Sequence, residues 1–306
     1  MKILIIGKTG QVSWELQRSM GLLGGVECLG RPELDLAEPD SVRRAIRRFT
    51  PDLLINAAAY TAVDQAESEP HLAMKINGEA PGIMAEEMKR IDGLMIHYST
   101  DFVYDGSGES PWVEDSPTAP LNTYGASKLA GDRAVAAAAG SYLIFRTSWV
   151  YGARGRNFLR TILRLAVSEK PLRIVDDQIG SPTWSSDIAT ATSLVVKQLS
   201  QAAAGESQLG AMASEVSGIY HLSSSGFVSW CGFASAIVDQ WQSLGMNQGQ
   251  RPQIVPITSA EYPTPARRPK NSRLSNAKLN AVFGVSLPQW RQSLAMAMRD
   301  LAPSNV

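Results

Sequence analysis

The sequence predicts an α/β fold with a doubly wound parallel sheet and a second, smaller α/β domain toward the C-terminus. Three observations indicate this class. Short, nearly all-apolar runs alternate with longer amphipathic stretches through the first half of the chain, and the first run leads directly into a glycine-bearing turn. Strands that are apolar throughout are typical of sheets covered by helices on both faces. After about Trp149 the alternation loosens, and proline and aromatic residues become irregularly spaced.

The alternation defines each expected element. Apolar runs predict strands at residues 2–6, 26–29, 53–56, 94–98 and 142–146. Amphipathic periodicity predicts helices at residues 12–22, 40–49, 66–90 and 123–139. Parallel strands need such crossover helices, so this order indicates a doubly wound sheet.

The second half divides less clearly. We expect residues 1–149 to form the first domain and residues 150–306 to belong mainly to a substrate-binding domain. A further strand at residues 218–222 is expected to return to the main sheet. Residues 201–217 are rich in Ala, Gly and Ser, which indicates an exposed connector.

Composition excludes several classes of protein. The 306 residues include 29 basic and 29 acidic side chains, so no net charge would attract nucleic acid or an anionic membrane. No apolar run is long enough to span a bilayer. The chain has two cysteines, Cys28 and Cys231, and begins in a strand without a secretory leader, so we expect a cytoplasmic protein. The three histidines lack metal-ligand spacing, so we expect no metal centre.

The turn after the first expected strand matches a phosphate-binding loop. Gly7 permits a tight turn, Gly10 allows the backbone to approach a pyrophosphate, and the helix that opens near Gln11 offers free N–H groups to that anion. Ser13 replaces the usual third glycine. This order of elements predicts a dinucleotide-binding Rossmann domain, although a strand–turn–helix without ligand remains an alternative.

The end of the second strand is expected to set the choice of nucleotide. A carboxylate there would bind a ribose 2′-hydroxyl, whereas a cation would bind a 2′-phosphate. The residues are Leu29, Gly30 and Arg31, so Arg31, with Lys8, predicts NADPH as cofactor and NADH as an alternative. An exposed arginine is more often simply solvated, so that alternative stays open for Arg31. Asp35 and Leu36 are expected beside the adenine.

Tyr124 is the only one of eight tyrosines with a lysine, Lys128, four residues later. On a helix these two side chains share one face. A neighbouring ammonium favours the phenolate and brings a phenol of pKa about 10 closer to neutral pH. The pair therefore predicts a proton-transfer site, although of order one such pair arises by chance in a chain of this length.

Together these motifs resemble the extended short-chain dehydrogenase/reductases and, within them, the dTDP-4-dehydrorhamnose reductases. The resemblance runs end to end. It rests on the phosphate loop and on segments 56–64, 98–104, 124–128, 145–151, 156–158, 175–183 and 262–274. The later segments are the most specific, because the tyrosine–lysine pair is common to the whole superfamily.

The resemblance implies reduction of dTDP-4-dehydro-L-rhamnose to dTDP-L-rhamnose. Tyr124 would donate a proton to the C4 carbonyl oxygen while the nicotinamide delivers hydride to C4. Lys128 would hold the nicotinamide ribose and lower the pKa of Tyr124. Thr100 would hydrogen-bond the carbonyl or the phenol, although a strand-terminal hydroxyl can also cap backbone. Asp101 would contact the sugar.

The remaining site residues fall into two groups. Cofactor-binding residues are expected to be Gly7, Thr9, Gly10, Gln11, Val12, Arg31, Asp35, Leu36, Ala57, Ala58, Ala59, Tyr60 and Thr61, with Tyr124 and Lys128. Further substrate-binding residues implied by the resemblance are Trp149, Asn157, Gln178 and Arg268. Trp149 would also suit the core, and Arg267 and Arg273 compete with Arg268 as pyrophosphate ligands.

Alternatives to this reductase stay open at the level of sequence. The chain could act on another sugar nucleotide as a reductase or epimerase. It could also be a non-catalytic NADP-binding regulatory subunit, like that of methionine adenosyltransferase. Some similar reductases dimerise through magnesium bound by glutamates. Here Glu15 matches one such ligand but Ser186 and Arg291 stand at the others, so a monomer or weak homodimer is expected.

Overall fold

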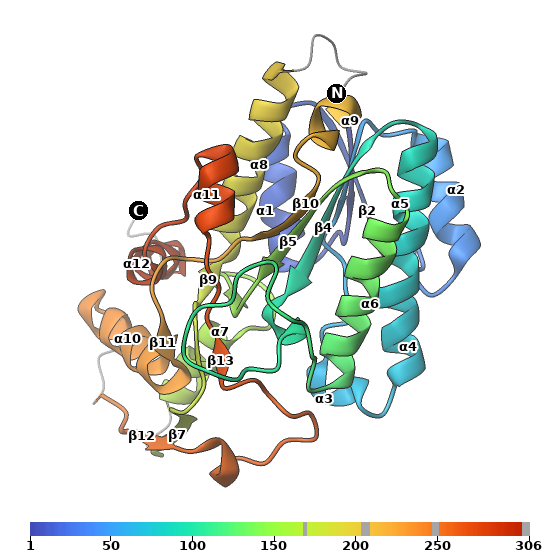
Figure 1. The fold of residues 1–306 in the computed structure, drawn as a ribbon. Helices are drawn as coiled ribbons and strands as arrows, with labels where there is room; N and C mark the ends of the chain where they lie inside the picture. The colour runs from blue at the N-terminus through green and yellow to red at the C-terminus, as the bar shows by residue number, and fades with distance from the viewer. Residues whose placement is uncertain (168–169, 203–208, 247–250, 302–306) are drawn as a thin grey trace.

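A six-stranded parallel sheet forms the centre of the molecule in the computed structural model, which describes residues 1–167, 170–202, 209–246 and 251–301 (Figure 1). In spatial order its strands are β10 (Gly218–His221), β5 (Ser141–Thr147), β4 (Leu94–Thr100), β3 (Leu53–Asn56), β1 (Lys2–Ile6) and β2 (Gly25–Leu29). Every neighbouring pair is parallel. The chain order reverses between β1 and β3, and ligands bind at such a switch point in open α/β sheets.

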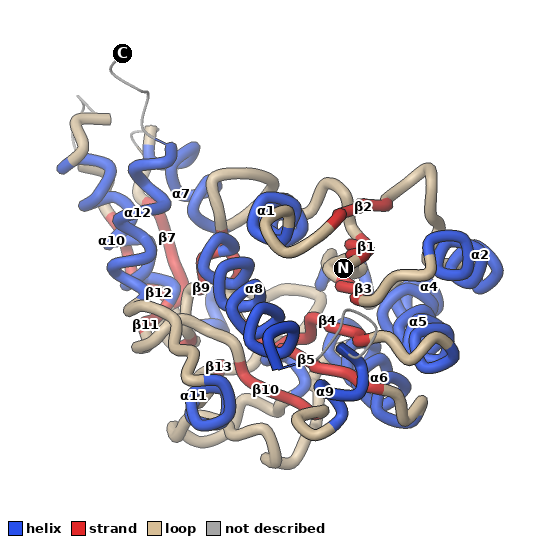
Figure 2. The backbone as a smooth tube through the Cα atoms, turned by 90° about the horizontal axis from the view of Figure 1, so that it is seen from above, coloured by secondary structure: helices blue, strands red, loops and turns tan. Residues whose placement is uncertain are grey.

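Helices cover both faces of this sheet, giving three layers (Figure 2). One face carries α1 (Gln11–Met20), α8 (Ser185–Ala202), α9 (Leu209–Ser214) and α11 (Ala277–Phe283). The other carries α2 (Pro39–Phe49), α5 (Ala80–Arg90) and α6 (Thr123–Ala137). Side chains alternate between the layers: Ile3 and Ile5 pack toward α1, whereas Leu4 and Ile6 pack toward α2. The all-apolar strands therefore reflect burial on both faces.

A smaller α/β unit lies against the carboxyl end of the sheet. Its core joins aromatic side chains, including Tyr151, Trp184, Phe233 and Trp290. It contains α7 (Phe158–Ala166), α10 (Trp230–Ser243) and α12 (Trp290–Leu301), with β7 (Leu172–Val175) paired to β12 (Ile254–Ile257). Short pairs join β6 (Val150–Tyr151) to β9 (Thr183–Trp184), and β8 (Ile179–Gly180) to both β11 (Val228–Ser229) and β13 (Asn271–Ser272). Because α8, α9 and β10 pack on the main sheet, the chain crosses between the two units more than once.

The stretch predicted as one helix at residues 66–90 is divided. It comprises α3 (Val63–Ala66), α4 (Pro70–Met74), a π-helical turn η1 (Lys75–Glu79) and α5. Pro70 fixes a new helix start. In the π-turn the amide of Asn77 binds both the N–H (2.8 Å) and the carbonyl (3.0 Å) of Tyr60. π-Turns are frequent at functional sites, and this one holds the chain segment after β3 in place.

The expectation of an exposed connector at residues 201–217 is wrong for most of the stretch that the structure describes. Helix α8 extends to Ala202, and α9 buries Leu209 and Ala213 against the sheet. A Cβ on Gly210 would lie 2.1 Å from the carbonyl oxygen of Asp92. Gly210 and Ala213 thus mark close packing, whereas Ala202, Ala211 and Ser214 are exposed as expected. Residues 203–208 lie outside the described part.

In the described part of the chain, 3-10 turns lie directly after β4, at η2 (Asp101–Val103), and after β12, at η4 (Ser259–Glu261). Within the described residues, no helix combines the length and apolar character needed to cross a membrane.

Candidate active site

The glycine turn after β1 is built for close approach of a ligand. Gly7 adopts φ +117°, and a Cβ there would lie 3.1 Å from the backbone of Ala57 and Ala58. Gly10 precedes the first turn of α1, and its N–H donates to the Gly7 carbonyl (3.0 Å). Ser13, which stands where a third glycine was expected, donates its hydroxyl to the carbonyls of Gly7 and Gly10. Ser13 thus ties the helix to the turn and leaves the N–H groups of α1 facing outward.

This turn forms one wall of a cavity of about 660 Å³ at the carboxyl ends of the central strands, here called the dinucleotide pocket. All the expected cofactor-binding residues line it: Gly7, Thr9, Gly10, Gln11, Val12, Arg31, Asp35, Leu36, Ala57, Ala58, Ala59, Tyr60, Thr61, Tyr124 and Lys128. Thr147 also lines it, with a buried hydroxyl that has no hydrogen-bond partner among the described residues. The glycine cradle, the helix N-terminus and this hydroxyl fit a dinucleotide.

The part of the pocket next to the end of β2 carries an ion pair that the sequence did not predict. Lys8 Nζ lies 2.8 Å from Glu33 Oε1, and Arg31 lines the same region. Sequence reasoning also missed Arg156, which lines the dinucleotide pocket from the loop before α7. Two arginines therefore face the pocket from separate segments, and arginine suits phosphate by bidentate pairing.

The candidate catalytic helix, α6, begins at the edge of this pocket with a well-formed N-terminus. Asn122 caps it by accepting from the N–H of Gly125 (2.8 Å). Glu67 accepts from the N–H of Thr123 (2.8 Å). A carboxylate in this position stabilises a helix N-terminus. Tyr124 follows in the first turn, with its ring edge-on to Phe102 at 5.7 Å between centroids. These contacts fix the direction of the phenol.

The Tyr124 phenol is protonated at neutral pH. Burial raises the pKa of Tyr124, the Asp101 and Asp132 carboxylates raise it further, and a hydrogen bond with Thr100 opposes the rise. The expected lowering of this pKa by Lys128 is not found, because the Lys128 ammonium is directed instead to the Tyr98 carbonyl oxygen at 2.7 Å. A protonated phenol is the state that a proton donor requires.

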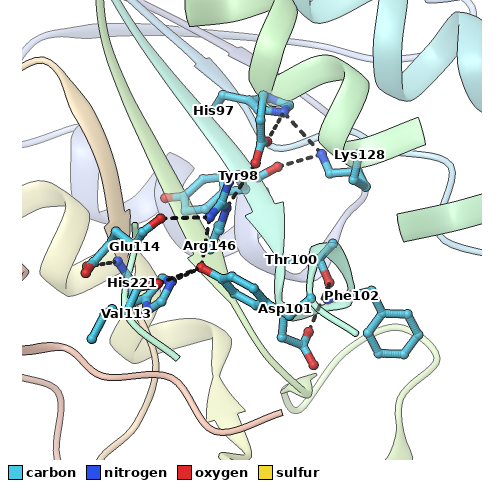
Figure 3. A network of polar contacts seen from close by, with 12 residues as sticks. His97, Tyr98, Thr100, Asp101, Phe102, Val113, Glu114, Lys128, Arg146 and His221 are labelled. Carbon is cyan, nitrogen blue, oxygen red and sulfur yellow. Dashed lines mark hydrogen bonds and ion pairs between the residues drawn. The ribbon is translucent and has the colours of Figure 1, made fainter. Parts of the chain in front are cut away.

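Thr100 ends β4 within this cluster (Figure 3). Its hydroxyl donates to Asp101 Oδ1 (3.0 Å) and accepts from the N–H of Phe102 (3.2 Å). Burial raises the pKa of Asp101 to about 6. The Thr100 hydroxyl thus caps the backbone N–H of Phe102 and also contacts Tyr124.

A second cavity of about 500 Å³ opens beside the active-site helix and is called here the outer pocket. Its lining includes Gln178, Arg267, Arg268 and Lys270. Arg268 forms a bidentate ion pair with Asp64 (3.0 and 2.8 Å), and Lys270 Nζ lies 3.1 Å from Asp177 Oδ2, whereas Arg267 is exposed. The outer pocket therefore offers several cations, and both Arg268 and Lys270 already have a carboxylate partner.

Trp149 and Asn157 have different surroundings. Trp149 stacks on Trp230 at 3.5 Å between ring centroids and lies directly over Gly180, where a Cβ would come within 2.6 Å of the indole. Its φ of 48° is rare for a bulky residue. Asn157 caps α7 and donates to Gln11 Oε1 (2.8 Å). Asn157 thus positions a cofactor-lining residue, and its side chain is occupied by contacts within the protein.

A Rossmann-type sheet whose switch-point pocket collects a glycine turn and a tyrosine–lysine pair, with a strand-end threonine hydrogen-bonded to the tyrosine, defines a short-chain dehydrogenase/reductase. Across the described residues, no group of three or more His, Cys, Asp or Glu side chains is arranged to hold a metal ion.

Comparison with known proteins narrows this class. The family model of the RmlD substrate binding domain matches residues 1–302. The dTDP-4-dehydrorhamnose reductase of Burkholderia thailandensis is 49% identical over 305 residues, covering 98% of this chain and 99% of that protein. The Escherichia coli K12 reductase of the same name is 39% identical over 306 residues, covering 98% of each. The chain therefore belongs to the dTDP-4-dehydrorhamnose reductase family.

Solved structures agree with this assignment. The crystal structure of dTDP-4-dehydrorhamnose reductase from Bacillus anthracis in complex with NADP has a TM-score of 0.85 and 29% identity, covering 98% of this chain and 99% of that one. An orthologue from Clostridium acetobutylicum has a TM-score of 0.87 and 32% identity, with the same coverage. The Thermus thermophilus UDP-glucose 4-epimerase, at 18% identity and a TM-score of 0.77 over the whole of both chains, shares the fold.

Proposed function

We propose that this protein reduces the C4 keto group of dTDP-4-dehydro-L-rhamnose to give dTDP-L-rhamnose, with NADPH as the hydride donor and NADH as an alternative donor. The observation that carries the proposal is that Tyr124 and Lys128 both line the dinucleotide pocket, and that Thr100 hydrogen-bonds the Tyr124 phenol. Its support is the full-length similarity to reductases with this name.

Each catalytic residue has a separate role in the proposed reduction. When bound, the reduced nicotinamide supplies the hydride that C4 of the ketosugar receives. The Tyr124 phenol gives its proton to the carbonyl oxygen, so the C=O bond becomes a C–OH group. Thr100 holds the phenol and the substrate oxygen in line, and Lys128 would supply the cation that holds the nicotinamide ribose. Positioned proton donation of this kind contributes about 10²–10⁴ in rate.

The outer pocket is proposed to hold the nucleotide end of the substrate. Arg267 and Lys270 supply positive charge for the pyrophosphate, and Gln178 supplies an amide at its wall. Arg268 would act together with its Asp64 partner by fixing the segment that carries these groups. The rigidly stacked Trp149 is proposed to face the deoxysugar, where an indole packs well against apolar sugar carbons.

The proposal is tested by mixing purified protein with NADPH and dTDP-4-dehydro-L-rhamnose. We expect NADPH oxidation and an equal amount of dTDP-L-rhamnose in the product. UDP- and GDP-linked 4-ketosugars serve as matched competitors and should react at least tenfold more slowly. Faster reduction of a competitor would assign a different nucleotide sugar, and NADPH binding without oxidation of any of them would contradict a reductase.

We further propose a cytoplasmic enzyme that is a monomer or weak homodimer. Both cysteines are free, as a reducing compartment favours. Ser186 and Arg291 stand where similar reductases would need further metal-binding carboxylates. Light scattering with magnesium and with a chelator should give the same mass; a magnesium-dependent dimer would contradict the proposal.

A further inference from the structure

The Lys128 ammonium lies in the protein interior, where its positive charge needs nearby polar or negative groups to stabilise it. Its side chain is 2% exposed, although it lines the dinucleotide pocket. Burial lowers the pKa of Lys128 to about 8, and the Asp132 carboxylate opposes that fall. A lysine that must remain charged at neutral pH therefore depends on the groups that surround it.

His97 supplies one of these groups. It lies on β4, is fully buried, and places Nε2 3.2 Å from Lys128 Nζ (Figure 3). Burial, with the nearby Lys128 cation, lowers the pKa of His97 well below its usual value, so the ring is neutral. An ammonium can only donate, so Nε2 accepts and the ring hydrogen lies on Nδ1. The Asn56 atom nearest to Nδ1 is the amide nitrogen Nδ2, at 3.0 Å. Because both an Nδ1–H and an amide NH2 are donors, this tautomer requires the Asn56 amide to turn its oxygen toward the ring.

Asp132 supplies the counter-charge from one helical turn further along α6. Its Oδ1 lies 4.0 Å from His97 Nε2, and its Oδ2 accepts from Arg146 Nε (3.1 Å). Burial raises the pKa of Asp132, while Arg146, the Ser99 hydroxyl and Lys128 lower it. The charged groups facing the ammonium are thus Asp132 on α6 and, behind it, Arg146 on β5.

Arg146 is also held by residues on the side of its guanidinium that lies away from Lys128. Its Nη1 donates to the Tyr104 hydroxyl (2.8 Å), which lies 2.7 Å from His221 Nε2. The backbone N–H of His221 in turn donates to Glu114 Oε1 (2.8 Å). Asp132 is therefore held by a fixed guanidinium, and its position relative to Lys128 is set by the fold.

We propose that His97 and Asp132 are positioning residues that hold the Lys128 ammonium in its charged form at the wall of the dinucleotide pocket. The inference deepens the proposed reductase function and rests on it. Neither residue reaches the reacting atoms, so each acts through Lys128. Together they stabilise the positive charge of the buried lysine, as water does for an exposed one.

The test compares His97→Gln and Asp132→Asn with the wild type. His221→Gln is the control, because it makes the same change in an equally buried histidine of the same cluster without touching Lys128. We expect the alkaline limb of kcat/KM to move down by about one pH unit in Asp132→Asn, since an opposite charge nearby shifts a pKa by about 1–3 units. A smaller downward shift is expected for His97→Gln. The control should lose thermal stability and move the alkaline limb by less than either variant, because Arg146 keeps its own contact with Asp132.

NADPH affinity against pH gives a readout that is independent of the sugar. As the pH is raised, NADPH affinity should begin to fall at a lower pH in the two variants than in the wild type. Fluorescence titration measures this affinity. If Asp132→Asn does not fold because Arg146 is left unpaired, Asp132→Asn with Arg146→Gln removes both charges and is measured instead. Folded variants with wild-type profiles, or a control that shifts equally, would overturn the inference. Absence of turnover in the wild type would count against the reductase alone, because the binding profiles still test Lys128.

Discussion

Replacing Gly7 with alanine should damage both the fold and cofactor binding. Gly7 adopts φ +117°, a region that residues with a side chain rarely occupy, and the strain there is about 1–3 kcal/mol. The added Cβ would also lie 3.1 Å from the Ala57 carbonyl and from the Ala58 nitrogen. These are backbone atoms at the end of a buried strand, so they cannot move aside easily. Crowding of this kind costs about 1–3 kcal/mol.

The two effects sum to about 2–6 kcal/mol, and about 0.4–1 kcal/mol is gained by restricting the unfolded chain. We therefore predict a loss of about 1–5 kcal/mol in the free energy of unfolding. Urea denaturation measures this loss. Gly108→Ala is the matched control: its φ is +68°, and no atom lies within 4 Å of the added Cβ. It should lose only about 1–2 kcal/mol, the penalty of the left-handed backbone alone.

Cofactor affinity gives the second readout for the same pair. The Gly7→Ala methyl displaces the turn that carries the N–H groups of α1, so we expect NADPH affinity to fall at least tenfold, measured by fluorescence titration. Gly108→Ala should bind NADPH as the wild type does. Equal stability of the two variants, with unchanged NADPH affinity in Gly7→Ala, would refute this account of the turn.

Three further predictions concern separate parts of the chain. Arg31→Ala should raise the KM for NADPH about tenfold and leave that for NADH unchanged, because only NADPH carries a 2′-phosphate; equal rises would refute the role. Thr100→Val should lower kcat about 10–100-fold while NADPH affinity, measured by titration, is retained; an unchanged kcat would leave Thr100 as a backbone cap only. The Arg47 guanidinium lowers the pKa of buried Glu87. The ionised Glu87 carboxylate therefore stabilises the fold above the pKa that it has in the unfolded chain, and this stabilisation is lost as the pH falls through its pKa in the folded protein. Glu87→Gln should therefore reduce the free energy of unfolding by about 1 kcal/mol at pH 7, a small value because the partners of Glu87 are largely solvated. The difference in unfolding free energy between variant and wild type should shrink below about pH 4. A difference that does not change with pH would contradict this prediction.

The sheet and the phosphate turn could be predicted because their signals are local. The apolar run at residues 2–6 matches β1, and the glycine spacing that follows places the turn directly after that strand. All the cofactor-binding residues predicted from these motifs line one pocket, since parallel strands present their carboxyl ends at the same edge of a sheet.

What could not be predicted depends on contacts between distant segments. The pairing of Arg268 with Asp64 joins residues 204 positions apart. Spacing placed Lys128 beside Tyr124, yet it said nothing of the buried His97 and the Tyr98 carbonyl, which draw the ammonium toward the sheet. The π-turn at Asn77 was hidden because its helical periodicity resembles that of a continuous helix.

The central claim is that Tyr124 donates the proton during reduction of a bound ketosugar. It is tested most directly by measuring turnover and NADPH affinity together in Tyr124→Phe, with Lys128→Met beside it. The account predicts that Tyr124→Phe loses about 10²–10⁴ in kcat with wild-type NADPH affinity, whereas Lys128→Met loses both. Turnover near the wild-type rate in Tyr124→Phe, or equal loss of NADPH affinity in the two variants, would contradict it.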